Sequence, residues 1–516
     1  MKRFLSILLL AVLTLSLVCP PALAEEADPE TIRVTDDYAY VLKEDGTAEI
    51  TQYTGKDKKL KIPSQLEGYT VTSFRDRAFY EQRQLTQVEV PDTVKSMGYE
   101  SFGWCVALTS IILPEGLETM GTNMFWYCSK LTKVNIPDSV QKLGEGVFAG
   151  CDALKAITLS PEHPLLAMVD GVLFNTVDST LLWYPVSRKG KAYTVPDDTK
   201  RIGSDAFTHV KLESVVLPES MEELADSAFS ACGSLKTIYI PSKVEKLIGA
   251  INSCDSLESI AISEKNESLV SVDGVLFEKA TNTLLLYPVA KKDKTYTIPE
   301  GTEVLAKVAF DSAKFTEIVI PESVRIIGSN AFRFCDRLKT IEIPEGVEQI
   351  DSFAFQYCTA LTTISLPATL KTVDTNPFLC CEKLAEIVIA EDHPVFTLVN
   401  GCLVQREDMT LISYPMGLKE KTLEFPSEIR KIGTEAFFRC KGIQEVTFAE
   451  GLVEIGESAF HGCTGLKRVV LPASLVEIDQ MAFDLDKLQN TVFVVVRGSF
   501  AEEFCTENSL HFVYAE

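Results

Sequence analysis

Residues and motifs that common enzymes use are scarce in this chain. It has five histidines in 516 residues. No G-x-S-x-G segment is present, which excludes the nucleophile elbow of the α/β hydrolases. The absence of H-E-x-x-H and of G-x-x-x-x-G-K-[ST] excludes a zinc-protease helix and a phosphate loop of those types. Carboxylates are abundant, but the sequence does not show which two could pair across a substrate. We therefore predict a protein that is not an enzyme, with no catalytic residues and no cofactor.

Metal-ligand spacings are missing as well. The sequence has no C-x-x-C pair, the usual half of a zinc site. Asp170-Gly171 and Asp273-Gly274 lack the further oxygen ligands of a calcium loop and are typical of tight turns instead. His163 and His393 each precede a proline in corresponding segments, which indicates a turn residue at both places. No metal site is expected.

Basic residues are outnumbered and long apolar runs are rare. Lysine and arginine total 49 against 73 acidic residues, a net charge of −24, which disfavours nucleic acid as a partner. The one long apolar run, residues 4–18, follows Lys2-Arg3 and leads to Ala22-Leu23-Ala24, as in a secretory signal peptide. We expect cleavage near Ala24, no transmembrane segment in the mature chain, and a secreted or cell-surface location.

What the sequence does contain is a repeat. A phenylalanine after a small residue recurs at Phe79, Phe102, Phe125, Phe148, Phe207, Phe229, Phe310, Phe332, Phe355, Phe378, Phe437, Phe460 and Phe483. The first four are 23 residues apart, and the unit reads L-x-x-I-x-I-P-x-x-V-x-x-I-G-x-x-A-F-x-x-C. Its opening alternates apolar and polar residues, which is typical of a half-buried strand that ends at proline. Such a period predicts a solenoid of stacked coils.

Three longer intervals interrupt the repeat and resemble one another. Each carries Asp-Gly or Asn-Gly between apolar residues and then a T-L-L-x-Y-P or similar block, which predicts a small β-meander. We call these intervals the islands. The predicted organisation is a signal peptide at 1–24, an N-terminal hairpin cap at 25–59, a solenoid at 60–488 with islands at about 160–196, 263–299 and 390–426, and a strand-helix-strand cap at 489–516.

These motifs carry a family resemblance. The repeat unit and its D-G-V-L-F…T-L-L-x-Y-P islands, spread over residues 60–488, resemble the BspA-like (Treponema pallidum-type) bacterial leucine-rich repeat. The resemblance implies a β-rich leucine-rich-repeat solenoid of stacked ~23-residue coils with parallel sheets, three β-meander islands and terminal caps. It also implies an exported bacterial protein that adheres to a host or neighbouring-cell protein.

Cysteine is the one chemical peculiarity. Ten of the 14 cysteines occupy the last position of the repeat unit, where other coils have Val210, Ala313 or Asp486. This tolerance favours a ladder of buried free thiols, since a free cysteine packs like a small apolar residue. The alternative is the disulfide framework that is common in exported chains.

Two surfaces are candidates for partner binding. Aromatic residues gather on the loop edge before the cysteine, at Trp104, Trp126 and Tyr127 on consecutive coils and at Phe334 and Tyr357 on another pair. Outward positions of the main strands form a column that includes Ile112 and Tyr239. These rings and side chains could contact a protein or a glycan, or could simply pack on the next coil. We therefore expect a binding or adhesion protein, with a passive envelope spacer as the alternative; the sequence does not predict an oligomeric state.

Overall fold

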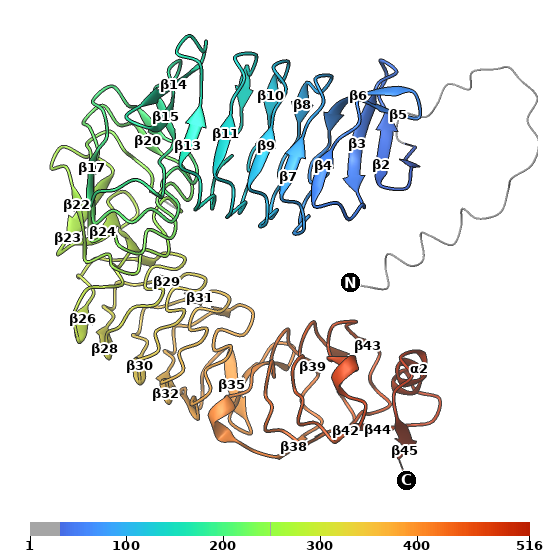
Figure 1. The fold of residues 1–516 in the computed structure, drawn as a ribbon. Helices are drawn as coiled ribbons and strands as arrows, with labels where there is room; N and C mark the ends of the chain where they lie inside the picture. Colours follow the sequence, from blue (N-terminus) through green and yellow to red (C-terminus); the bar gives the residue numbers. More distant parts are fainter. Residues whose placement is uncertain (1–30, 248, 516) are drawn as a thin grey trace, which may run out of the picture. The chain divides into compact units, whose positions relative to one another are not determined.

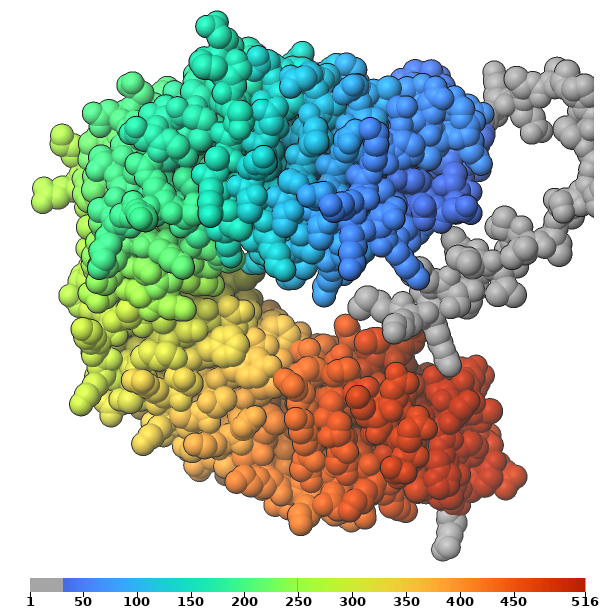
Figure 2. All heavy atoms as spheres, in the orientation of Figure 1, coloured from blue at the N-terminus to red at the C-terminus, as the bar shows by residue number. Residues whose placement is uncertain are grey.

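Short parallel strands recur throughout the computed structural model, which describes residues 31–247 and 249–515 (Figure 1). The chain divides into two compact units, Met1–Phe148 and Ala149–Glu516. The predicted signal peptide at 1–24 lies outside the described residues. Within each unit the surface colour changes gradually along the chain in Figure 2, because every coil packs against the coils before and after it.

The first unit begins with an antiparallel cap. Its strands are β1 (Arg33–Val34), β2 (Tyr38–Leu42), β3 (Ala48–Tyr53), β5 (Gln65–Leu66) and β6 (Tyr69–Phe74). Strand β2 pairs antiparallel with β3, and β3 then pairs parallel with β6. From β6 the sheet continues in parallel through β8 (Ser96–Met97), β10 (Thr119–Met120) and β12 (Lys142–Leu143). The hairpin therefore covers the first coil, and its sheet continues through β6 into the parallel second strands of the following coils.

Most coils contribute one strand to each of two rows. In the first unit the main row holds β4 (Lys59–Lys61), β7 (Gln87–Glu89), β9 (Ser110–Ile112) and β11 (Lys133–Asn135), and the second row holds β8, β10 and β12. The middle residue of each main strand is buried and its neighbours are more exposed, as the alternating sequence predicts. Proline follows the main strand and ends it.

The second unit repeats this plan over more coils. Its main row holds β13 (Ala156–Thr158), β17 (Ala192–Thr194), β19 (Ser214–Val216), β21 (Thr237–Ile240), β22 (Ser259–Ile262), β26 (Thr295–Thr297), β28 (Glu317–Val319), β30 (Thr340–Glu342), β32 (Thr363–Ser365), β34 (Glu386–Val388), β38 (Thr422–Phe425), β40 (Glu445–Phe448) and β42 (Arg468–Val470). Its second row holds β18 (Arg201–Ile202), β20 (Glu223–Leu224), β27 (Val304–Leu305), β29 (Ile326–Ile327), β31 (Gln349–Ile350), β33 (Thr372–Val373), β39 (Lys431–Ile432), β41 (Glu454–Ile455) and β43 (Glu477–Ile478).

The islands are three-stranded antiparallel meanders. They comprise β14 (Leu166–Val169), β15 (Val172–Asn175) and β16 (Thr180–Trp183); β23 (Leu269–Val272), β24 (Val275–Glu278) and β25 (Thr283–Leu286); and β35 (Phe396–Val399), β36 (Cys402–Gln405) and β37 (Thr410–Ser413). The last strand of each meander pairs parallel with the second strand of the next coil. Each island thus starts a new stretch of the second row.

The repeated phenylalanines form the spine of the core. Phe332 stacks between Phe310 and Phe355 with ring centroids 5.0 and 5.1 Å apart and planes within 2° of parallel. Each fully buried ring contributes about 1.5–3 kcal/mol through burial alone. In the islands a tyrosine takes the phenylalanine position: Tyr287 stacks near Phe310 at 5.5 Å, and its N–H donates to the Ala309 carbonyl. The fold class predicted from the repeat is confirmed.

The cysteines form a hydrogen-bonded ladder. All 13 described cysteines are buried free thiols. Cys105 Sγ lies 3.2 Å from the carbonyl oxygen of Phe79, and Cys358 Sγ lies 3.1 Å from that of Phe332, one coil earlier in both cases. The thiol therefore gives this carbonyl a second donor, because the Phe332 oxygen also accepts from the Cys335 N–H at 3.1 Å. This arrangement is the buried thiol ladder that the sequence favours.

The second unit ends with a strand, a helix and a further strand. Strand β44 (Val492–Val495) extends the main row, helix α2 (Phe500–Glu507) begins at Ser499, and β45 (Phe512–Tyr514) pairs parallel with β44. The Ser499 hydroxyl accepts from the Glu502 N–H, as a helix N-cap requires. Two 3-10 turns, η1 (Met416–Leu418) and η2 (Leu485–Lys487), complete the elements. Within 31–247 and 249–515, no helix has the length and apolar character needed to cross a bilayer.

Candidate functional site

The structure brings the three aromatic residues of the first unit together. Trp104 stacks on Tyr127 with ring centroids 4.9 Å apart and planes 18° apart, and Trp126 meets both rings edge-on. All three side chains are partly exposed. Arg83 lies over the Trp104 ring, with Cζ 5.9 Å from its centroid. We call Trp104, Trp126 and Tyr127 the aromatic edge. The rings pack on the next coil and also face solvent.

The backbone of the aromatic edge is in an unusual conformation. Trp104 has a φ of +57° and Tyr127 a φ of +55°, in the left-handed region. The turn itself demands this conformation, because the same repeat position is glycine in Gly150 (φ +69°) and Gly462 (φ +73°). A residue with a side chain costs about 1 kcal/mol or more there relative to glycine. The same position also has a positive φ where it holds Glu81, Ala231 or Ser312, so the conformation belongs to the turn and the rings accept its cost.

The second aromatic pair has the same geometry. Phe334 and Tyr357, with φ of +57° and +58°, stack at 4.9 Å with planes 11° apart. Phe334 is 41% exposed, and the Arg333 guanidinium lies over it at 5.4 Å. The Tyr357 hydroxyl accepts from Arg439 Nη1 at 3.2 Å. This pair therefore repeats the aromatic edge in the second unit.

The strand column is less concentrated. Ile112 is 62% exposed, but its register partner on β7 is Glu89, which is paired with Lys61. Tyr239 is half-buried, and its hydroxyl donates to Glu219 Oε1 at 3.0 Å. The register places Tyr239 beside Val216, which is 51% exposed. Ile112 lies in the first unit and Tyr239 in the second.

A polar groove lies where the second row is interrupted. Among the residues that the structure describes in the coil after β20, 241–247 and 249–254, none forms a second strand. The Glu223 and Ala225 N–H groups donate back to the carbonyl groups of Lys200 and Ile202 on the preceding coil. The resulting cavity measures about 1190 Å³.

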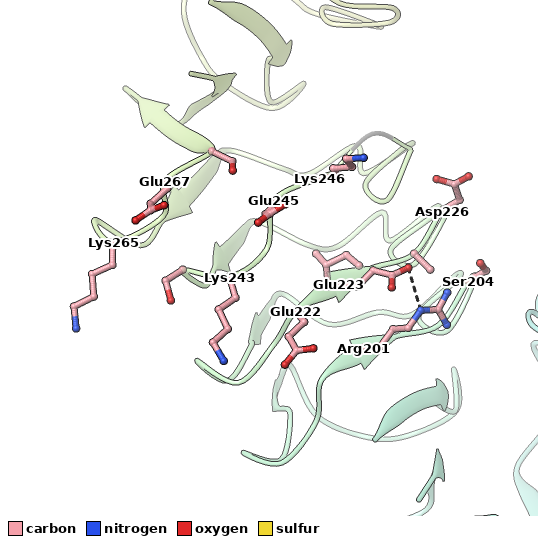
Figure 3. A pocket seen from close by; sticks show the side chains of 14 residues that line it. Arg201, Ser204, Glu222, Glu223, Asp226, Lys243, Glu245, Lys246, Lys265 and Glu267 are labelled. Carbon is pink, nitrogen blue, oxygen red and sulfur yellow. Dashed lines mark ion pairs between the residues drawn. The ribbon is translucent and has the colours of Figure 1, made fainter. Parts of the chain in front are cut away.

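Charged side chains of both signs line this groove. Figure 3 shows Arg201 and Asp226 at one end of the lining and Lys243 and Lys265 at the other. Arg201 Nε is 3.1 Å from Glu223 Oε1. The sequence analysis missed this groove. The signal was a shortened coil, because Val244 precedes Cys254 by ten residues where Met221 precedes Cys232 by eleven.

The predicted turn histidines fasten the islands. His393 is 1% exposed; its Nδ1 accepts from the N–H groups of Val395 and Phe396, and Nε2 donates to the Pro367 carbonyl at 3.0 Å. Asn266 performs the same task in the second island, where its Oδ1 accepts from Leu269 N–H and its Nδ2 donates to Pro241. This role is structural. The described parts of the chain hold no group of three or more His, Cys, Asp or Glu side chains placed to bind a metal ion.

The stacked coils, the two strand rows and the phenylalanine spine define a leucine-rich-repeat solenoid. The chain belongs to the family described as the BspA type leucine rich repeat region (6 copies), whose model matches residues 58–176, 187–283, 302–420 and 416–512. The predicted family is therefore confirmed. No curated protein matches the chain at the threshold applied.

Several solved structures are similar to the chain. A leucine rich cell surface protein from Faecalibacterium prausnitzii A2-165 is 27% identical over 70% of this chain and 95% of its own, with a TM-score of 0.43. A leucine-rich repeat protein from Eubacterium ventriosum is 20% identical over 63% and 93%, with a TM-score of 0.44. The leucine rich repeat protein of T. pallidum is 20% identical over 60% and 91%, with a TM-score of 0.25.

Proposed function

We propose that this chain is an exported, non-enzymatic binding protein that uses the loop edge of its coils to adhere to a protein or glycan of a host or neighbouring cell. The observation that carries the proposal is the stacking of partly exposed aromatic rings at the same turn position of successive coils, in two separate pairs. A passive spacer gains little from large apolar rings that remain partly exposed. Aromatic residues are frequent anchors of protein interfaces.

Two further features support this reading. The signal-like N-terminus of this chain agrees with export. The thiols and the phenylalanine rings are buried and contact other core residues. Contact with a partner therefore falls to the exposed surface, which includes the loop edge. We propose a secreted or cell-surface location on the same grounds.

A binding assay with matched variants tests the proposal. The mature chain is applied to an array of matrix proteins and an array of oligosaccharides. We expect saturable binding to one panel with a Kd of about 1 μM or lower, which corresponds to about −8 kcal/mol. The double variant Trp104→Gly with Tyr127→Gly keeps the turn conformation and removes the rings, so it should lose the binding. Val34→Ala, an exposed apolar change elsewhere in the same unit, should retain it.

If the wild-type chain binds nothing on either array, the envelope-spacer function is favoured. Equal binding by the double glycine variant and the wild type would remove the aromatic edge from the proposal. Circular dichroism spectra of both variants, taken before the assay, ensure that a loss of binding is not a loss of fold.

A further inference from the structure

Each island leaves a notch in the loop edge of the coil stack. The island tyrosine takes the phenylalanine position, but the chain then leaves through a proline, as at Tyr287-Pro288, and does not form the x-x-Cys turn. The turn of the coil before the island therefore faces the turn of the coil after it across a missing layer.

A side chain bridges two of these notches. It comes from the residue two positions after the phenylalanine in the coil that follows the island. At the first island His209 Nδ1 lies 2.9 Å from Asp152 Oδ1, on the coil directly before the island. At the third, Arg439 reaches past the preceding coil, whose turn ends at Cys381, and its Nη1 lies 3.2 Å from the Tyr357 hydroxyl one coil further back. His209 and Arg439 have φ of +63° and +58°. A basic side chain thus spans each gap from the same backbone conformation.

The second notch has no such bridge. The equivalent residue is Ser312, which has the same backbone conformation (φ +62°) but a side chain too short to cross. Asp255, which follows Cys254 as Asp152 follows Cys151, forms no hydrogen bond or ion pair with any described residue. The gap contains a cavity of about 310 Å³. Its lining includes Asp255 from the coil before the island and Ser312 from the coil after it.

The walls of this cavity suit a long basic side chain. Leu257, Leu286 and Val308 form apolar wall, against which an aliphatic stem can pack. The lining also contains Arg333, but its Nε and Nη2 are 2.8 and 3.1 Å from the two oxygens of Asp311, so this cation is already neutralised. Asp255 remains as the carboxylate without a counter-ion.

We propose that the second notch receives a lysine or arginine side chain from a protein partner. The inference rests on the proposed binding function and names the partner chemistry at one point of the same loop edge. The other two notches show that a basic side chain fits this geometry, and the net charge of −24 draws basic partners towards the surface. A long cation with its charge at Asp255 and its stem on the apolar wall is a typical interface anchor.

A small probe tests the notch directly. N-acetyl-arginine amide is titrated into the full mature chain by NMR or calorimetry, with the neutral isostere N-acetyl-citrulline amide as the control probe. We expect saturable binding of the arginine probe that is at least tenfold tighter than that of citrulline. Asp255→Asn should weaken it at least tenfold, whereas Asp198→Asn, at an exposed aspartate elsewhere in the same unit, should leave it unchanged.

The variant Ser312→Arg supplies the missing bridge from within. Because Arg439 occupies the equivalent backbone conformation, we expect this variant to fold with a Tm no lower than the wild type and to lose the arginine probe. Equal affinity for arginine and citrulline, or probe binding that survives both Asp255→Asn and Ser312→Arg, would overturn the inference. If the chain binds an arrayed macromolecule but not the arginine probe, the notch inference fails and the proposed function stands. If the probe binds and the arrays stay silent, the proposed function fails.

Discussion

The turn at Trp104 allows a sharp test, because its positive φ favours glycine whereas the contacts of its ring favour tryptophan. In Trp104→Gly the left-handed conformation becomes free of cost, which returns about 1 kcal/mol. The change also loses the stack on Tyr127, about 0.5–1.5 kcal/mol, and part of the burial of the ring, about 1–2 kcal/mol. Trp104→Ala loses the same contacts and keeps the backbone cost. We therefore expect the glycine variant to be more stable than the alanine variant by about 1 kcal/mol.

The neighbouring Trp126 provides the matched control. It belongs to the same aromatic edge, but its φ is not positive. Here glycine carries only its usual entropic penalty, so Trp126→Ala should be more stable than Trp126→Gly by about 0.5–1 kcal/mol. Urea unfolding of all four variants, followed by far-UV circular dichroism, gives the two orders. If alanine is the more stable replacement at both positions, the argument from backbone cost is wrong.

Three further outcomes are expected. Asn266→Ala should lower the free energy of unfolding by about 2–4 kcal/mol, because its side chain makes three buried hydrogen bonds and one part-buried one, whereas His393→Asn should cost less than about 1 kcal/mol in the same denaturation assay. Burial raises the pKa of the Cys358 thiol well above its usual range, so native protein should be inert to a thiol reagent at pH 8 and become reactive on unfolding; reaction of most thiols in the native state would contradict the ladder. Burial, with a smaller contribution from Glu457, raises the pKa of Glu435, so its charge destabilises the fold as pH rises through that pKa; Glu435→Gln should raise the Tm at pH 7 and lose this advantage in acid.

The repeat period of the sequence predicts most of the fold, namely the stacked coils and their main strands. Phe310 and Phe332 mark successive coils, and the alternating residues before each proline mark the main strands, because burial of one face imposes both patterns. The tyrosine substitution in the islands was also readable. Tyr287 stands 23 residues before Phe310, the spacing of the repeat itself, although its block looks like an ordinary strand end.

The candidate surfaces were only partly readable. The sequence placed Trp104 and Tyr127 on one edge, but their positive φ could not be inferred, because neither is a residue that usually signals that conformation. The second notch is open because Ser312 is short where His209 is long. This difference is recognised only when the three islands are compared as equivalent gaps. Side-chain reach across a missing layer is a property of three-dimensional spacing and leaves no periodic trace.

The middle strands of the islands have a consequence for how the second unit comes apart. Along β24, Val275 and Phe277 belong to one cluster of buried apolar side chains and Leu276 to the cluster before it. Leu403 and Val404 on β36 divide in the same way between two clusters. The apolar core of the second unit is therefore divided into segments that meet at the second and third islands. Hydrogen exchange should then show blocks of amides that open together, with their boundaries at the second and third islands, so that a long chain of coils loses its structure piecemeal.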